Sequence, residues 1–458
     1  MNLPSFRAIA TALLGVSLLH AAAGRAEPPV QQAIYSNATV IDGTGAAARH
    51  HQDIVVADER IVAIVPHGSS AAQDDVRTRH IDLSGRFVIP GLIDSHVHMA
   101  TPPDPAKARA QLRRDLYGGV TAVRDMADDT RFVAELAREA RYAEIPAPDI
   151  ALVALFAGRP FFADPRVGAA SKGYAPGTAP WMQAIDAQTD LSEAVTLARG
   201  TGATAIKIYA DLPRDLIAAI TREAHRQHML VWAHSAVFPT RPADVIDAGV
   251  DTVSHVCYLA YQVEPVMLSS YEDHTPVHED LLEQPEDPVM AGLFADMVRR
   301  GTILDATGSL FVRRDAERAA HPERKPLRCT GPATTRLTRQ AWRAGVPIST
   351  GTDSVAGAES QWPDVFAEIE FLVREVGMPP LAAIHSATEV GARAMGRESD
   401  MGTLEPAKLA NFVVLSADPV ADIGHIRSVE LTVKRGHEYR RADYRPVTAE
   451  EMGGDDED

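Results

Sequence analysis

Two histidines one residue apart close an apolar stretch near the start of the chain. Residues 88–98 (VIPGLIDSHVH) have the pattern of a buried strand that ends in His96 and His98. Because side chains alternate between the two faces of a strand, both imidazoles point to the same side. Two imidazoles in this arrangement can bind one cation. Two histidines that are satisfied by hydrogen bonds at a polar strand end give the same pattern, so this stretch leaves both interpretations open.

A lysine lies within a second apolar stretch. Lys207 stands in the segment AIKIY, residues 205–209. Burying an unpaired ammonium is costly, so such a lysine has to be neutral, paired or chemically changed. A neutral amine reacts with carbon dioxide to give a carbamate, which is a carboxylate on a long arm and can bridge two cations. An ion pair with an acid such as Asp125 explains the pattern equally well.

Three more polar residues follow short apolar runs. His234 follows LVWA, His255 follows TVS, and Asp353 follows STGT. Taken singly, each histidine is typical of a hydrogen-bonded side chain, and the aspartate is typical of a helix cap. Imidazole and carboxylate are also the ligands that a hard or borderline divalent cation accepts. The case for a metal site therefore depends on whether the fold brings the whole set together.

The elements that must position these residues are short apolar strands that alternate with amphipathic segments, such as residues 214–228 and 363–376. Eight strands are predicted to end at His98, Met126, Phe156, Ala210, Ser235, Val256, Thr307 and Asp353. Eight strand–helix repeats predict an α/β fold with a (β/α)8 TIM barrel over residues 88–396. The carboxyl ends of barrel strands converge on one mouth. The candidate ligands are therefore expected to meet there: His96, His98, Lys207, His234, His255 and Asp353.

Both ends of the mature chain are rich in β-branched residues. Short strands before the barrel and after it predict a small composite β-sandwich built from residues 27–87 and 397–446. Residues 447–458 end in GGDDED and are expected to form an acidic tail.

Two segments depart from the barrel repeat. Residues 157–189 are rich in Gly, Pro and aromatic residues and are expected to form a long loop after the third strand. Residues 258–288 are acidic and are expected to form a lid after the sixth strand. His274 and His278 lie in this second segment, and we expect them to be solvated rather than part of a metal site.

Composition and the first residues bear on partners and location. With 45 basic and 62 acidic residues the formal charge is −17, which disfavours binding to nucleic acid or to an anionic membrane. Residues 1–26 have the pattern of a signal peptide, and their apolar run is shorter than the roughly 20 residues that span a bilayer. The only cysteines, Cys257 and Cys329, lie far from the cleavage region. We expect an exported protein, periplasmic or secreted, without a lipid anchor and with one possible disulfide.

The ordered set of motifs resembles the amidohydrolase superfamily, most closely its imidazolonepropionase-related, Xaa-Pro dipeptidase-like branch. The matching stretches are residues 90–98, 119–126, 206–208, 233–234, 249–255, 351–353 and 402–410. The resemblance implies a barrel with a composite sandwich and two metal ions, usually zinc, with a carboxylated lysine. At the matching positions, His96, His98 and Asp353 would bind one metal, His234 and His255 the second, and carboxylated Lys207 would bridge them.

Some positions depart from the family pattern. Ala407 and Asn411 stand in the sandwich where glycine and aspartate are frequent. Ser254 stands where an acid is common, and residues 127–128 stand where glycines are common. These differences leave the identity of the substrate undetermined, but they do not affect the predicted metal site.

The resemblance implies a hydrolytic mechanism. Two neighbouring cations lower the pKa of a bridging water, and the resulting hydroxide attacks a carbonyl. Asp353 would accept the proton and transfer it to the leaving amine. We expect a small-molecule amide substrate, such as a dipeptide or an N-acyl amino acid. Hydrolysis of a carbamate, ester, lactone or phosphotriester is the alternative, and a barrel scaffold without catalysis is the third hypothesis.

Three residues are candidates for substrate contacts. Tyr209 shares a strand face with Lys207, and Arg313 and Arg314 follow the seventh strand. An arginine there can bind a substrate carboxylate through two parallel hydrogen bonds. A surface or structural role is the alternative for each of the three. The sequence is compatible with a homo-oligomer but does not determine the oligomeric state.

Overall fold

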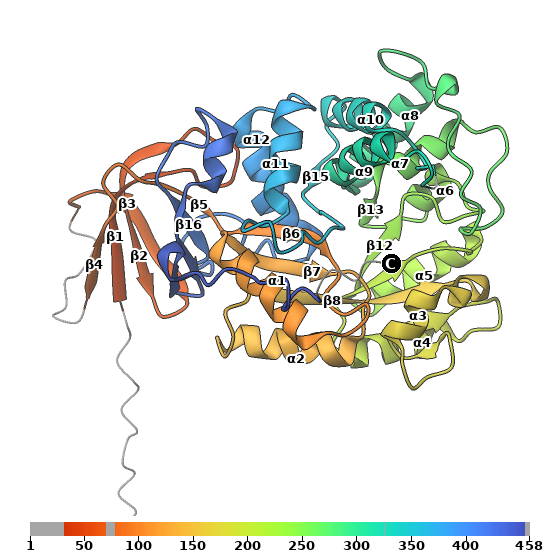
Figure 1. The fold of residues 1–458 in the computed structure, drawn as a ribbon, viewed down its shortest axis with the longest axis horizontal. Helices are drawn as coiled ribbons and strands as arrows, with labels where there is room; N and C mark the ends of the chain where they lie inside the picture. The colour runs from red at the N-terminus through yellow and green to blue at the C-terminus, as the bar shows by residue number, and fades with distance from the viewer. Residues whose placement is uncertain (1–31, 70–77, 325, 454–458) are drawn as a thin grey trace, which may run out of the picture.

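The computed structural model describes residues 32–69, 78–324 and 326–453. A sheet built from both chain ends lies at one end of the molecule, and a helix-covered barrel forms the rest (Figure 1). The expected signal peptide, residues 1–26, lies outside the described residues. Among the described residues, no helix combines the length and apolar character needed to span a bilayer.

The larger unit is a barrel of parallel strands in chain order. Its strands are β6 (Leu92–Val97), β7 (Val120–Asp125), β8 (Asp149–Ala157), β11 (Ala205–Ile208), β12 (Leu230–His234), β13 (Thr252–Ser254), β14 (Ile303–Asp305) and β15 (Ile348–Ser349). The first and last strands meet where Ser95 N donates to Thr350 O at 3.0 Å. The predicted (β/α)8 barrel is therefore confirmed.

The outer layer consists of helices that bury one apolar stripe each. They are α1 (Pro105–Tyr117), α2 (Thr130–Arg141), α3 (Pro165–Ala170), α4 (Leu191–Gly200), α5 (Arg214–Arg226), α6 (Pro242–Asp247), α7 (Val256–Leu259), α8 (Pro288–Arg300), α9 (Gly308–Ala320), α10 (Gly331–Arg343), α11 (Val365–Arg374), α12 (Pro380–His385) and α13 (Gly391–Ala394). In α5 the buried positions Ile217, Ile220 and Ala224 follow the helical repeat. Aspartate side chains begin several helices by accepting backbone N–H groups, as Asp104 does for α1.

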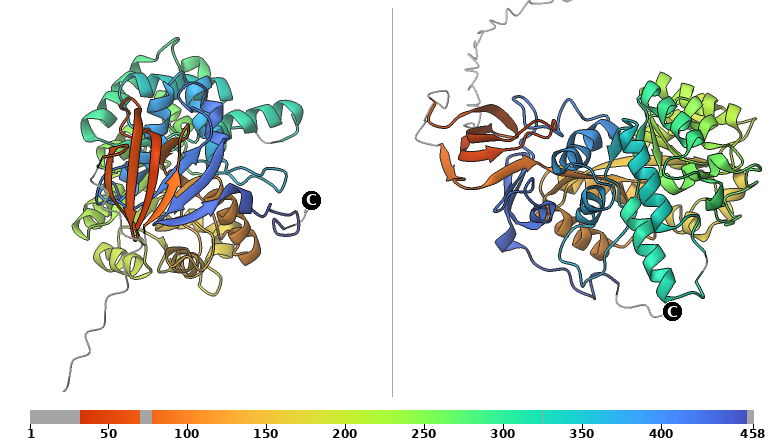
Figure 2. Two further views of the ribbon diagram at one scale, coloured as in Figure 1. Left: turned by 90° about the vertical axis from the view of Figure 1, so that its left-hand side faces the viewer. Right: turned by 90° about the horizontal axis from the view of Figure 1, so that it is seen from above.

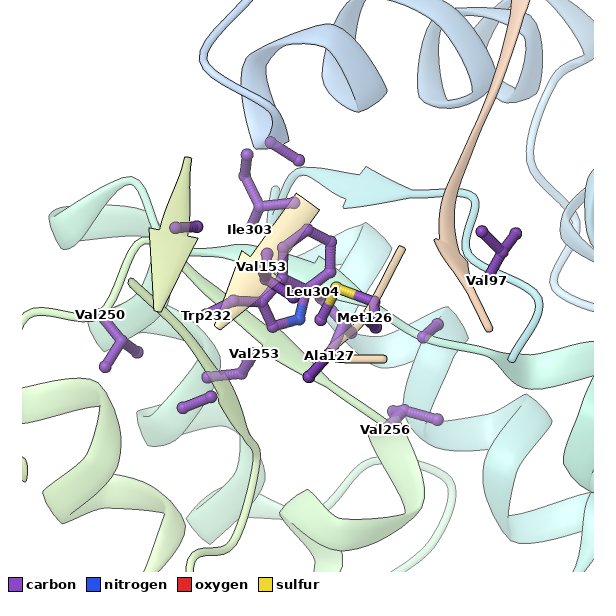
Figure 3. Packing of buried hydrophobic residues seen from close by; sticks show 14 of the residues in the cluster. Val97, Met126, Ala127, Val153, Trp232, Val250, Val253, Val256, Ile303 and Leu304 are labelled. Atoms are coloured by element: carbon purple, nitrogen blue, oxygen red, sulfur yellow. The ribbon is translucent and has the colours of Figure 1, made fainter. Parts of the chain in front are cut away.

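Trp232 fills the barrel interior beneath the mouth. It is 1% exposed and packs among apolar side chains that include Val153 and Leu304 (Figure 3). Its indole nitrogen donates to Ser254 Oγ, and the Arg124 guanidinium lies 4.3 Å from the ring centroid. The interior is therefore a packed core rather than a channel, and it supports the site above it.

The smaller unit is one eight-stranded sheet that joins both chain ends (Figure 2). Its strands are β1 (Gln32–Val40), β2 (Arg49–Ala57), β3 (Arg60–Pro66), β4 (Arg79–Asp82), β5 (Phe87–Pro90), β16 (Phe412–Leu415), β17 (Val429–Lys434) and β18 (His437–Arg440). The two ends meet where β5 pairs with β16. The Tyr35 and Phe412 rings pack edge to face at 4.9 Å in its core. The predicted composite β unit is thus confirmed.

The stretch predicted as one strand over residues 88–98 is two strands. It breaks at Gly91, so that β5 belongs to the composite sheet and the barrel begins with β6 at Leu92. A Cβ atom at Gly91 would lie 2.1 Å from Thr121 Oγ1, so only glycine permits this close approach. The boundary between the two units therefore lies at Gly91, slightly later than the expected start of the barrel at residue 88.

The segment after the third barrel strand, expected to be a plain loop, has its own structure. It contains α3, a 3₁₀ turn (Arg159–Ala163), and the short strands β9 (Thr178–Ala179) and β10 (Met182–Ala184). Strand β10 pairs with the last residues of β8, beyond the part of β8 that pairs with β7. The expectation was wrong because this pairing with a distant strand leaves no local pattern.

The other long segment and the C-terminal residues are tied to the barrel. Residues 258–288 form an irregular connection, and a disulfide joins Cys257 to Cys329. Residues 447–452 do not behave as a free tail, because Val447 is 4% exposed and Glu451 accepts a hydrogen bond from Arg113 at 2.7 Å. The acidic residues 454–458 lie outside the described part of the chain.

We expect Gly91→Ala to lower the free energy of unfolding by about 1–3 kcal/mol, because the added methyl group collides with Thr121. Urea unfolding measures the change. Gly292→Ala in α8 is the matched control: a Cβ there meets nothing within 4 Å, and alanine favours a helix interior. Equal stability of the Gly91 and Gly292 variants would contradict this account of the break.

Candidate active site

A cavity of about 420 Å³ opens at the carboxyl ends of the barrel strands. It is lined by all six side chains that the sequence predicts to meet, and they come from the ends of β6, β11, β12, β13 and β15. The residues are His96, His98, Lys207, His234, His255 and Asp353.

The Asp353 carboxylate lies among three imidazoles. Its Oδ1 is 3.6 Å from His96 Nε2 and 3.4 Å from His98 Nε2, and its Oδ2 is 3.9 Å from His255 Nε2. The ligand atoms of His96, His255 and Asp353 all lie within 4.8 Å of one another. Asp353 has a φ of 47°, and its amide donates to His96 O at 2.9 Å, which fixes the backbone that carries the carboxylate. One metal ion could contact donors from several of these side chains.

Three of the imidazoles each have an oxygen atom close to Nδ1. Asp305 Oδ2 lies 2.7 Å from His96 Nδ1, Asp128 Oδ1 lies 3.0 Å from His98 Nδ1, and Thr307 Oγ1 lies 2.8 Å from His255 Nδ1. At His96 and His255, an acceptor on Nδ1 fixes the proton there and leaves the Nε2 lone pair free for a ligand role. At His98, burial opposes the charged form, but the carboxylates of Asp128 and Asp353 prevail and raise the pKa to about 10, so a metal ion would have to displace the Nε2 proton. The sequence reasoning missed these residues. Asp305 and Thr307 stood at a predicted strand end, the same signal that identified His234.

Burial sets the protonation of the deepest imidazoles. Desolvation lowers the pKa of His96 well below its usual value and the pKa of His255 to about 3. Desolvation likewise lowers the pKa of His234. These rings are therefore neutral at physiological pH, which is the form that binds metal ions.

Lys207 is buried beside His96, and among the residues that the structure describes it has no carboxylate partner. Its side chain is 1% exposed, and Nζ lies 3.4 Å from His96 Nε2. Within the described part of the chain, no carboxylate oxygen lies within 4.0 Å of this nitrogen. Asp125 instead accepts from the amides of Met99 and Asp128, so the alternative of a Lys207–Asp125 pair is wrong. Burial lowers the pKa of Lys207 to about 8.

His234 has an unsatisfied nitrogen in this cavity. Its ring centroid lies 3.9 Å from that of Tyr209 and 4.9 Å from that of His255. Its Nδ1 is buried and has no hydrogen-bond partner within the described ranges of the chain. Buried polar atoms in proteins are nearly always paired, so this nitrogen calls for a partner such as a metal ion or a solvent molecule.

Aromatic side chains form one wall of the cavity. Tyr209 stands there as predicted from its strand face, and its ring lies 4.4 Å from Phe161 and 5.3 Å from Tyr271. Tyr258 and Phe311 extend this wall. Phe161 and Tyr271 come from the two long segments after the third and sixth strands, so these segments shape the pocket.

The two predicted arginines differ in their surroundings. Arg314 lines the cavity, whereas Arg313 lies outside its lining and donates to Ser354 Oγ at 2.6 Å. The candidate role of Arg313 is thus not supported by its position. Two arginines that the sequence did not single out, Arg166 and Arg328, also line the cavity.

Those two arginines are already engaged. Arg166 forms an ion pair with Asp164 at 2.6 Å. Arg328 donates to the carbonyl oxygens of Tyr271 and Asp273 at 2.6 and 2.9 Å. Among the described residues, Arg314 makes no ion pair or hydrogen bond, so its guanidinium is available to a ligand.

Both histidines of the 258–288 segment are exposed, as expected, but each also has a tertiary contact. His274 lines the cavity, and its Nδ1 lies 3.2 Å from Arg328 Nη2. His278 lies 2.9 Å from Glu264 Oε2, and that carboxylate raises its pKa. Both are fixed by tertiary contacts that a local sequence pattern does not reveal.

The model of the amidohydrolase family matches residues 87–438. The chain therefore belongs to the amidohydrolase family, and it is a hydrolytic enzyme that acts on carbon–nitrogen bonds. Members of this family generally bind divalent metal ions, which agrees with the cluster of His96, His255 and Asp353.

Individual relatives are distant. The ochratoxinase of Aspergillus niger is 24% identical over 430 residues, which cover 84% of this chain and 81% of that protein. A D-hydantoinase of Streptomyces coelicolor is 34% identical over 99 residues, only 20% of this chain and 21% of that protein. The crystal structure of a Xaa-Pro dipeptidase with bound methionine superposes with a TM-score of 0.69 and 22% identity, over 89% of this chain and all of that chain.

We expect Lys207→Met to stabilise the metal-free protein at pH 7 by roughly 3 kcal/mol, since one pKa unit is worth about 1.4 kcal/mol. The pKa of about 8 in the folded state lies below the value of 10.5 for a free lysine. The unfolded chain therefore binds more protons between these values, and the wild type gains stability as pH rises through this window. The variant lacks that gain, so the difference in stability between the two proteins should shrink as pH rises.

Urea unfolding at pH 7 and pH 9.5, in buffer free of carbon dioxide, measures the difference between the two proteins. Titrating groups remote from Lys207 cancel in this difference. A gap between variant and wild type that stays constant from pH 7 to pH 9.5 would contradict the assigned burial of a lysine without a carboxylate partner.

Proposed function

We propose that the protein is an exported, dinuclear metal-dependent hydrolase of small amides that carry a free carboxylate, such as dipeptides and N-acyl amino acids. One observation carries the proposal. Six side chains of ligand type, from five barrel strands, line a single cavity around the Asp353 carboxylate. Family membership supports cleavage of a carbon–nitrogen bond.

The donor set fits two metal ions. His96, His98 and Asp353 would hold the first ion, and His234 and His255 would hold the second. The unpaired Nδ1 of His234 and the absence of a carboxylate beside Lys207, among the described residues, support this assignment, because each leaves a buried polar group that needs a partner. A carbamate on Lys207 would supply the bridging carboxylate. Histidine nitrogen and carboxylate oxygen are suitable ligands for zinc.

Bound divalent ions would supply Lewis acidity, which polarises a carbonyl and makes water a better nucleophile at neutral pH. Side chains of the protein transfer the proton and orient the histidines. Asp353 accepts the proton that the attacking water loses and donates it to the leaving amine, because its carboxylate faces the cavity beside three imidazoles. Asp305 and Asp128 keep His96 and His98 oriented during this transfer.

The cavity wall indicates the shape of the substrate. The rings of Phe161, Tyr209 and Tyr271 offer an apolar surface for one half of an amide. Arg314 offers an uncommitted cation at the rim, which suits a carboxylate on the other half. An ochratoxinase and a Xaa-Pro dipeptidase among the relatives are compatible with such a substrate.

Export is part of the proposal. The signal-peptide pattern of residues 1–26 and the disulfide between Cys257 and Cys329 both support it, since disulfides persist in oxidising compartments. The formal charge of −17 disfavours nucleic acid as a partner.

We expect the purified enzyme to contain about two metal ions per chain, and Asp353→Asn to retain most of them while losing at least 10²-fold in kcat, because the amide cannot accept the proton. Elemental analysis and hydrolysis of a dipeptide and N-acyl-amino-acid panel measure both. Lys207→Ala, which removes the bridging group, should lose metal. Substantial activity of the Asp353→Asn enzyme would remove this residue from the proton transfer.

We expect Arg314→Met to raise KM about 10- to 100-fold for substrates with a free carboxylate, because the uncommitted guanidinium is lost. KM for the corresponding carboxamides should change little. Arg313→Met is the matched control, since Arg313 precedes it on α9 but contacts Ser354 outside the cavity. Similar losses in both variants, or for both substrate types, would exclude Arg314 as the carboxylate contact.

A further inference from the structure

Glu368 is a buried carboxylate of α11 that does not line the cavity. It is 0% exposed, and it accepts hydrogen bonds from Gly308 N at 3.0 Å and from Ser309 N at 2.8 Å. These are the first two residues of α9, whose N–H groups have no partner within the helix. A carboxylate also interacts favourably with the positive end of a helix. Glu368 therefore fixes the point at which α9 begins.

A second contact from α11 reinforces the first. A Cβ atom at Gly308 would lie 2.1 Å from a ring carbon of Phe371, so the start of α9 packs directly against this ring. Glu368 and Phe371 are three residues apart and lie on the same face of α11. Helix α11 thus holds the turn between β14 and α9 from outside the barrel.

The residue before Gly308 contacts a candidate metal ligand. Thr307 has a φ of 47°, which is rare for a β-branched residue and depends on surrounding contacts. Its hydroxyl donates to Ala306 O at 2.8 Å and lies 2.8 Å from His255 Nδ1. Because a hydroxyl has one proton, it must accept a hydrogen bond from His255 Nδ1–H. The Nε2 lone pair of His255 then faces the cavity, 3.9 Å from Asp353 Oδ2.

We propose that Glu368 is a positioning residue for His255. By holding the amides of Gly308 and Ser309, it keeps Thr307 in its left-handed conformation and so keeps the Nδ1–H tautomer of His255. The inference rests on the proposed function, because His255 must serve as a metal ligand for the tautomer to matter to catalysis. No contact between Glu368 and the substrate or the metal is involved.

Zinc titration of the metal-stripped protein against a competing chelator tests the contacts that lead from Glu368 through Thr307 to His255. Thr307→Val removes the acceptor and should weaken zinc binding about 10- to 100-fold at the site that His255 would share with His234. Glu368→Ala should weaken it about 10-fold in the wild-type background and cause no further loss in the Thr307→Val background, because both act through one hydroxyl. Thr307→Ser retains the hydroxyl and should bind zinc within about threefold of the wild type.

Glu370→Ala is the matched control. Glu370 lies on the same helix and pairs with Arg427 at 2.8 Å, away from α9, so zinc affinity should stay within about twofold of the wild type. Glu368→Gln keeps the side-chain shape and can accept only one of the two N–H groups, so its affinity should fall between those of the wild type and Glu368→Ala. If circular dichroism shows that Glu368→Ala does not fold, the zinc titration is carried out with Glu368→Gln instead.

The outcomes separate the two proposals. Additive losses in the double variant, or unchanged zinc affinity in Glu368→Ala or Glu368→Gln, would overturn the positioning role. Absence of zinc binding in the wild type would overturn the proposed function instead. In that event, ¹⁵N NMR of histidine-labelled protein still reads the tautomer: a shift of His255 from Nδ1–H to a mixture in Glu368→Gln supports the positioning role, and an unchanged tautomer overturns it.

Discussion

The closure of the barrel is the constraint on which the rest of the structure depends. Two backbone hydrogen bonds join its first and last strands, from Ser95 N to Thr350 O and from Asp353 N to His96 O. The second of these bonds sets the Asp353 carboxylate beside the imidazoles of the first strand. Without this closure, the candidate ligands near the start of the barrel domain and those near its end would not line one cavity, and the site would not form.

Neighbouring side chains fix the candidate ligands in place. Oxygen atoms of Asp305, Asp128 and Thr307 fix the imidazoles from behind, and the packed Trp232 supports them from below. This arrangement includes features that oppose folding, notably the buried Lys207 and the unsatisfied nitrogen of His234. Such features are typical of sites whose chemistry requires groups that a purely structural core would exclude. The large apolar core of the barrel offsets them.

The eight barrel strands were predictable because each is an apolar run long enough to be buried between helices. The composite β unit was predictable because β-branched strands occur at both chain ends. The break at Gly91 was not, since it follows from contact with Thr121 on another strand. The extra strand β10 was missed for the same kind of reason: its partner, β8, lies outside any local window.

For the site, the sequence alone determined which residues have ligand chemistry and that they stand at strand ends. Residue type gives the first, and the apolar pattern gives the second, because it reflects the burial of each element separately. Only the tertiary structure decided that Cys257 pairs with Cys329 and that Arg313 is engaged. It also decided that, among the described residues, Lys207 has no carboxylate partner and Arg314 makes no ion pair or hydrogen bond. These outcomes depend on side-chain contacts between segments distant in the chain, and local sequence patterns carry no record of which distant groups will meet.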